Sequence, residues 1–156
     1  MSRRTEISAG ILVFRRNPRL EVLLGHPGGP YWRNRDDGAW SIPKGVVESG
    51  DLLTCAKREF NEETGLTASG TFMPLKPARQ KSGKLVHAFA LEADYDLAGF
   101  SSIAFEIEWP PRSGKRANFP EIDRIAYFGL AAARKKILPG QRTFIEELAA
   151  TLKDAG

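Results

Sequence analysis

The segment between Asp51 and Gly65 constrains the fold more than any other part of the chain. It contains no Gly or Pro, it follows a favourable N-cap residue, and it ends at a favourable helix stop. The segment therefore predicts a helix from about Leu52 to Thr64. At about 100° per residue, its apolar residues form one broad face that consists of Leu52, Leu53, Cys55, Ala56 and Phe60.

Two glutamates, Glu59 and Glu63, fall inside this apolar face, and Glu62 lies beside them. Like charges one turn apart destabilise a helix by a few tenths of a kcal/mol, and partial burial raises that cost. A solvated charged face, with Arg58 pairing to Glu62, explains Glu62 alone. A site for a hard divalent cation explains all three, because Mg²⁺ and Mn²⁺ prefer carboxylate oxygens.

The residues from Gly45 to Leu66 resemble the Nudix box, whose pattern is G-x5-E-x7-R-E-U-x-E-E-x-G-U with U apolar. The half from Arg58 to Leu66 fits every specified position. In the other half Asp51 replaces the glutamate, and only six residues separate it from Arg58 where the pattern has seven. We interpret this as a one-residue deletion at the junction of loop and helix. Asp51 then serves as an N-cap, with Glu48 as the nearest loop carboxylate.

The resemblance implies a metal-dependent pyrophosphohydrolase, and it assigns roles to the box residues. Glu59 and Glu63 would bind Mg²⁺ or Mn²⁺ together with the carbonyl of Gly45. Glu62 would complete the metal site or act as the general base. Arg58 would orient these acids by pairing with them, or would contact a substrate phosphate.

Nudix hydrolases often recruit a further acid from outside the box. A strand expected from Ile103 to Trp109 places Glu106 and Glu108 on one face, opposite Phe105, Ile107 and Trp109. These two glutamates are the candidates, with Glu108 foremost and Glu121 behind them.

The loop from His26 to Gly38 combines turn-forming residues with large aromatic and basic side chains. Trp32 is suited to stacking on a base, and Arg33 and Arg35 to holding a phosphate. The alternative is a surface loop in which Trp32 packs as a plug.

The stretch from Trp40 to Gly45 is similar to the W-x-x-P-K-G of dinucleoside polyphosphate and diphosphoinositol polyphosphate hydrolases. That similarity makes Trp40 and Lys44 substrate-binding candidates and favours a nucleotide with an extended phosphate chain. The alternatives are an ADP-sugar, a nucleoside triphosphate, or a nucleotide- or RNA-binding module without turnover. Retention of all three box glutamates favours an enzyme.

The whole chain, residues 1–156, is long enough for one domain and too short for two. Strands are expected at 7–14, 20–25, 39–42, 71–80, 85–94, 103–109 and 122–128, and further helices at 131–137 and 141–153. This gives an α+β protein, and the resemblance implies a Nudix-type α-β-α sandwich with a mixed β-sheet.

The net charge of +4 comes from dispersed basic residues with no nucleic-acid motif, so a small phosphorylated substrate, such as a nucleotide, is the expected partner. No apolar run is long enough for a membrane span and no signal peptide is evident, so the chain is expected to be cytoplasmic.

Overall fold

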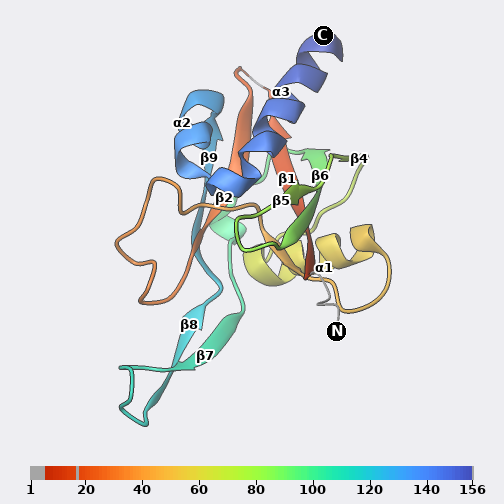
Figure 1. Cartoon of the computed structure of the whole chain (residues 1–156). Coiled ribbons are helices and arrows are strands. Elements are labelled where there is room, and N and C mark those ends of the chain that lie inside the picture. Colours follow the sequence, from red (N-terminus) through yellow and green to blue (C-terminus); the bar gives the residue numbers. More distant parts are fainter. Residues whose placement is uncertain (1–5, 17, 156) are drawn as a thin grey trace.

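A mixed seven-stranded sheet lies at the centre of the computed structural model, which describes residues 6–16 and 18–155 (Figure 1). The main strands run in the order β4-β6-β1-β2-β9, with β3 paired to β1 and β5 paired to β6. β1 is parallel to β6 and antiparallel to β2. The strands are β1 (Ile7–Arg15), β2 (Glu21–Pro27), β3 (Lys44–Val46), β4 (Phe72–Pro74), β5 (Ala78–Arg79), β6 (Leu85–Glu92) and β9 (Ile122–Gly129).

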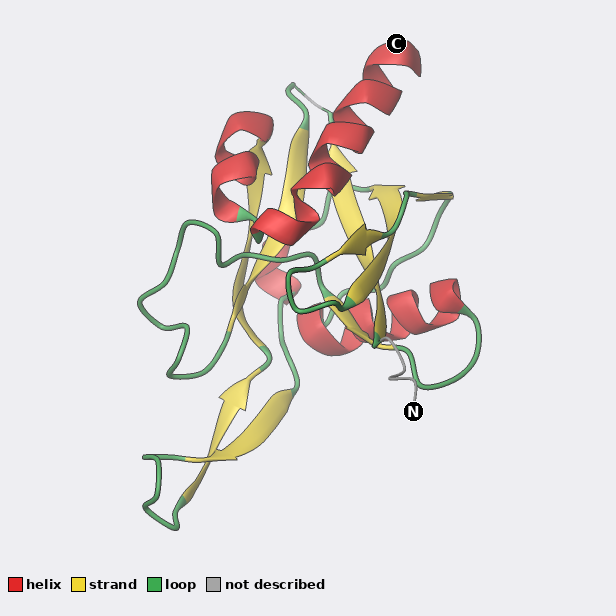
Figure 2. Cartoon of the chain, in the orientation of Figure 1, coloured by secondary structure: helices red, strands yellow, loops and turns green. Residues whose placement is uncertain are grey.

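Helices cover both faces of this sheet (Figure 2). Because side chains alternate along a strand, Ile11 and Val13 of β1 pack with residues of α1 (Leu52–Thr64), including Phe60. Leu12 of β1 faces the opposite way, into the core formed with α2 (Leu130–Lys136) and α3 (Arg142–Ala155). The predicted α-β-α sandwich is confirmed. Two short 3₁₀ turns, η1 (Leu97–Gly99) and η2 (Pro139–Gln141), complete the helical elements. Among the described residues, no helix has the length and apolar character needed to cross a membrane.

Two of the strand predictions are wrong in detail. The segment 39–42 forms only isolated bridges, Trp40 to Ile137 and Ser41 to Gly25, and the strand β3 begins beyond it. The segment 71–80 is divided into β4 and β5. Pro74 and Pro77 have no backbone N–H to donate to a ladder, which accounts for the interruption between them.

A separate two-stranded hairpin projects from the sandwich (Figure 1). It consists of β7 (Ala104–Glu108) and β8 (Arg116–Pro120). The expected strand at 103–109 corresponds to β7, whereas no strand was predicted where β8 forms. The hairpin is anchored to the box helix, since the amide of Ile103 donates to the carbonyl of Glu62 at 2.9 Å. The amide of Glu121 in turn donates to the carbonyl of Ile103 at 2.8 Å.

Candidate active site

Both ends of α1 are fixed by its own sequence. The carboxylate of Asp51 accepts hydrogen bonds from the amide and the hydroxyl of Thr54, both at 3.0 Å, and Gly65 ends the helix with φ of 75°. Asp51 is exposed and caps the helix, whereas Glu48 lines the acidic cavity described next. The shortened box therefore keeps an intact helix and loses the usual first acid.

A cavity of about 480 Å³ lies along the side of α1 that carries the three glutamates, and we call it the acidic cavity. Glu59, Glu62 and Glu63 all line it, and Glu121 joins them from the start of β9. Its other lining residues are Lys44, Gly45, Val46, Glu48, Arg58, Lys84 and Ile103. The structure thus brings the box acids to one place, as the sequence predicts.

Glu59 packs directly against Gly45. A Cβ atom at Gly45 would lie 2.0 Å from the carboxyl carbon of Glu59, so only glycine leaves room for this carboxylate. Arg58 lies 3.7 Å from Glu59 and 4.0 Å from Glu62, measured from nitrogen to oxygen. Burial raises the pKa of Glu59, the neighbouring Glu62 acts in the same direction, and Arg58 opposes both. Arg58 is therefore placed to orient the acids.

Glu63 is the most perturbed acid of the site. Its Oε1 accepts a hydrogen bond from the backbone amide of Lys44 at 3.1 Å. Burial raises the pKa of Glu63 to about 8, although the hydrogen bond from Lys44 acts in the opposite direction. Burial also lowers the pKa of Lys44, and the neighbouring charge of Lys84 lowers it further. A partly buried acid and two lysines thus line the same cavity.

The register of β3 decides which backbone groups face α1. Val47 donates to Ile7 and Ile11 donates to Pro43, so the odd-numbered residues of this segment pair with β1. The carbonyl of Gly45 is consequently directed at β1, opposite Ala9. The carbonyl of Lys44, like its amide, is directed away from β1. The backbone carbonyl on the α1 side of β3 is therefore that of Lys44 and not that of Gly45, the predicted metal ligand, while Gly45 leaves space for Glu59.

The donors present suit a hard divalent cation. Three carboxylates and a backbone carbonyl supply the oxygen atoms that Mg²⁺ and Mn²⁺ prefer, and the missing Cβ of Gly45 admits one of the carboxylates. Within residues 6–16 and 18–155, no three acidic, His or Cys side chains are already gathered closely enough to enclose an ion. The acids of the described residues therefore line one cavity but are not close enough together to surround an ion.

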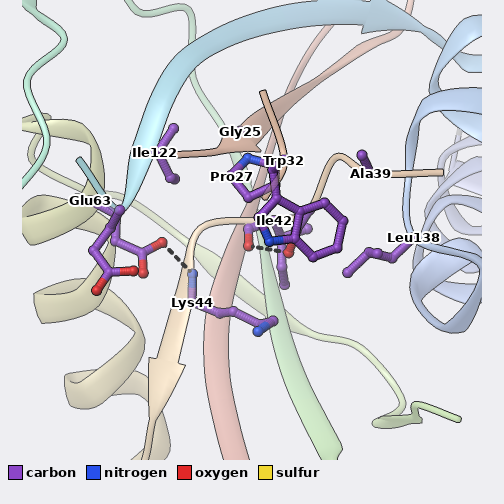
Figure 3. Close-up of a pocket in the computed structure, with 11 residues that line it drawn as sticks. Gly25, Pro27, Trp32, Ala39, Ile42, Lys44, Glu63, Ile122 and Leu138 are labelled. Carbon is purple, nitrogen blue, oxygen red and sulfur yellow. Dashed lines mark hydrogen bonds between the residues drawn. The ribbon is translucent and has the colours of Figure 1, made fainter. Parts of the chain in front are cut away.

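A second, more apolar cavity of about 220 Å³ adjoins the first, and we call it the apolar cavity (Figure 3). Figure 3 shows Glu63 at one end of it and Leu138 at the other, with Trp32 and Lys44 between them. Lys44, Glu63 and Glu121 line both cavities. The remaining lining residues are Gly25, Pro27, Ala39, Ser41, Ile42 and Ile122.

The predicted substrate-binding residues divide between cavity, surface and core. Trp32 and Lys44 line the apolar cavity. Arg33 and Arg35 are exposed on the same loop, and the guanidinium of Arg35 lies 5.8 Å from the centre of the Trp32 ring. Trp40 is only 5% exposed, and its indole donates to Asp36 at 2.8 Å. Trp40 is therefore a core residue rather than a substrate contact.

The candidate acids from outside the box also separate. Glu106 pairs with Arg116 at 2.6 Å on the hairpin, and Glu108 accepts a hydrogen bond from the amide of Arg112 at 2.9 Å. Neither lines the two cavities, whereas Glu121 lines both. The structure thus brings Glu121, rather than Glu108, together with the box acids. The position of Glu121 at the start of an apolar strand was the available sequence signal.

The chain matches the NUDIX domain family over residues 4–148. It is 40% identical over 57 residues to an RNA pyrophosphohydrolase of Caulobacter vibrioides, a match that covers 33% of this chain and 33% of that protein. The matched region is thus only a third of the length of the curated relative.

Solved structures agree along almost the whole chain. An Ap4A hydrolase from C. elegans in a binary complex superposes with a TM-score of 0.67 at 20% identity, covering 94% of this chain and 98% of that one. The NUDIX domain of Shewanella oneidensis NrtR, complexed with ADP ribose, superposes with a TM-score of 0.65 at 15% identity, covering 97% of this chain and 90% of that one. A mutT/nudix family protein from Listeria innocua superposes with a TM-score of 0.63 at 16% identity, covering 98% of each chain. This chain belongs to the Nudix hydrolase family.

Proposed function

We propose that the protein is a metal-dependent hydrolase that cleaves a pyrophosphate bond in a nucleoside diphosphate linked to another moiety, with a dinucleoside polyphosphate or another extended polyphosphate as substrate. The observation that carries this proposal is the junction of the two cavities at Lys44, Glu63 and Glu121. A nucleoside held in the apolar cavity would direct its phosphates across these residues into the acidic cavity.

The acidic cavity contains groups suited to each part of the reaction. Glu59, Glu62, Glu63 and the carbonyl of Lys44 would hold Mg²⁺ or Mn²⁺. A bound ion of this kind neutralises phosphate charge and lowers the pKa of a bound water. The side chains of Lys44 and Lys84, which line the same cavity, would neutralise further phosphate oxygens.

The proton of the attacking water needs a carboxylate acceptor that lines the same cavity. Glu62 and Glu121 both satisfy this condition. Glu108, the acid expected from the strand pattern, engages the hairpin loop instead. A Glu108→Gln variant should therefore retain turnover. Comparing Glu62→Gln with Glu121→Gln then identifies the proton acceptor, because the variant that loses it should show the larger decrease in kcat.

The test is a substrate screen with purified protein and Mg²⁺ or Mn²⁺. It compares diadenosine tetraphosphate, ADP-ribose, nucleoside triphosphates and 5′-triphosphorylated RNA. We expect phosphate or nucleotide release from an extended polyphosphate, its loss in excess chelator, and its return with excess metal ion. Turnover that persists undiminished in chelator would refute the metal-dependent mechanism. Glu59→Gln should reduce kcat by about a hundredfold or more, roughly 3 kcal/mol, while the protein stays folded.

A second candidate activity is removal of pyrophosphate from the 5′ end of RNA. The stretch of 57 residues that is 40% identical to an RNA pyrophosphohydrolase favours it. The same screen separates the two candidates, since kcat/KM for triphosphorylated RNA would then exceed that for diadenosine tetraphosphate.

A further inference from the structure

The loop after β2 and the β7–β8 hairpin form one packed unit. The amide of Gly28 donates to the carbonyl of Glu121 at 3.0 Å, at the base of the hairpin. A Cβ at Gly28 would lie 1.9 Å from the carbonyl oxygen of Pro120, and one at Gly29 would lie 3.0 Å from the ring of Phe105. Two consecutive glycines thus allow the loop backbone to pack closely on the hairpin.

This packing separates two neighbouring aromatic side chains of the loop. Trp32 lines the apolar cavity, whereas Tyr31 contacts Trp109 at the far end of β7. The rings of Tyr31 and Trp109 meet edge to face, with centroids 5.4 Å apart and an angle of 82° between them. Because Tyr31 directly precedes Trp32, this aromatic pair is held by the same loop that lines part of the apolar cavity.

Tyr31 is an unusual surface residue in this protein. It is 64% exposed, more than Val46 or Ile103, the other exposed large hydrophobic residues of the described chain. Its ring is nevertheless held in place from one side by Trp109. An exposed aromatic ring that is supported by a neighbouring ring can stack on a planar ligand without a large loss of side-chain freedom.

The surrounding charges indicate what kind of planar ligand fits. Arg33 follows the loop aromatics, while Arg112 and Lys115 lie in the turn of the hairpin just beyond Trp109. In the part of the chain that the structure describes, none of these three cations takes part in an ion pair. Exposed aromatic rings among uncommitted cations are the combination that binds unpaired nucleotides.

The hairpin turn that carries two of these cations is itself well organised. The amide of Trp109 donates to the carbonyl of Lys115 at 2.9 Å, and the amide of Arg112 donates to Glu108 at 2.9 Å. At about 3.3 Å per residue, Trp109 is carried roughly 20 Å from Ile103 on the rim of the acidic cavity. A ligand that reaches from the Ile103 side of the acidic cavity to Trp109 must therefore extend well beyond a single nucleoside diphosphate.

We propose that Tyr31, supported by Trp109, forms a stacking site for a second nucleobase, joined through phosphates to the one held in the apolar cavity. This proposal rests on the proposed function and names the substrate class of that site as nucleotides that carry two bases. The second base has two chemical sources, the distal nucleoside of a dinucleoside polyphosphate or the next nucleotide of a triphosphorylated RNA.

The experiment measures binding in a Glu63→Gln background, where turnover is slowed, with metal ion present. Diadenosine tetraphosphate is compared with adenosine tetraphosphate, and a triphosphorylated RNA trinucleotide is compared with ATP. Each pair differs by the presence of further bases. Tyr31→Leu removes the aromatic face but keeps an apolar side chain, and Tyr31→Phe keeps the ring and is the matched control.

We expect Tyr31→Leu to weaken binding of the two-base member of one pair by about fivefold to a hundredfold, and to leave its one-base partner within about twofold. Tyr31→Phe should bind like the parent. The pair that responds identifies the source of the second base. The proposal is overturned if Tyr31→Leu affects neither pair, or affects one-base and multi-base ligands equally. Binding is measured separately from hydrolysis by the unmodified protein, so the stacking site and the proposed activity can fail independently. Unfolding midpoints confirm that each variant is folded.

Discussion

Replacing Glu63 by glutamine should change how the stability of the metal-free protein depends on pH. In the folded protein burial raises the pKa of Glu63 from 4.5 to about 8. The unfolded chain ionises this group near its ordinary pKa, so between about pH 4.5 and pH 8 the folded state binds one more proton than the unfolded state. The free energy of unfolding therefore falls as pH rises through this window, by about 1.4 kcal/mol per pH unit from this group.

Across the whole window the loss is roughly 5 kcal/mol at most, and an error of one pH unit in the pKa changes it by about 1.4 kcal/mol. Glutamine carries no such cost, and its carbonyl oxygen can still accept the hydrogen bond from the amide of Lys44. The stability of Glu63→Gln relative to the parent should thus increase by at least about 2 kcal/mol between pH 5 and pH 8.

The assay is denaturant unfolding of both proteins in chelator at several pH values from 5 to 8.5. Glu48→Gln is the matched control, because Glu48 lines the same cavity but is exposed to water, and its stability should follow the parent. Excess Mg²⁺ or Mn²⁺ should then stabilise the parent more than Glu63→Gln, since the ion binds the charged carboxylate. Parallel stability curves for the parent and Glu63→Gln would refute the account of Glu63 as an acid destabilised by burial.

Three further outcomes are expected. Gly45→Ala should lower kcat by about tenfold or more with the protein still folded, because the new methyl group would displace the carboxylate of Glu59; wild-type kinetics would contradict that packing. The double change of Arg33 and Arg35 to Ala should raise KM by about tenfold if either grips a phosphate, and a change within about twofold would show them to be merely solvated. Phe144→Ala should cost about 3–5 kcal/mol of unfolding free energy, measured with denaturant, because this ring is fully buried; a cost below about 1 kcal/mol would be inconsistent with that burial.

Local signals were sufficient to predict the box helix and the acids on it. The N-cap at Asp51 and the stop at Gly65 determine the bounds of α1, and helical spacing places Glu59 and Glu63 on its packed side. The strand β8 escaped prediction because its sequence, from Arg116 to Pro120, is short, partly polar and ends in proline. Its strand conformation comes from antiparallel pairing with β7, which its own residues do not indicate.

The composition of the cavities required the tertiary structure. Lys84, Ile103 and Glu121 come from three distant parts of the chain, and no spacing in the sequence relates them to the box. Trp40 shows a different limit of the sequence, since an aromatic residue near a site is suited equally to stacking on a substrate and to packing in the core. Its contacts with His26 and Phe128, and its hydrogen bond to Asp36, settle that choice in favour of the core.

The hairpin leaves the sheet and returns to it at neighbouring residues, and its other contacts are with the loop after β2. Ile103 and Glu121 are hydrogen-bonded to each other, so the chain leaves the body and returns to it at a single point. An insertion or deletion at such a point leaves the strand register of the sheet and the position of α1 unchanged, because the flanking residues are already neighbours. The segment 104–120 is thus a site at which the length and chemistry of an accessory arm can be exchanged during evolution or by design. The framework that carries the acids need not be rebuilt for such an exchange.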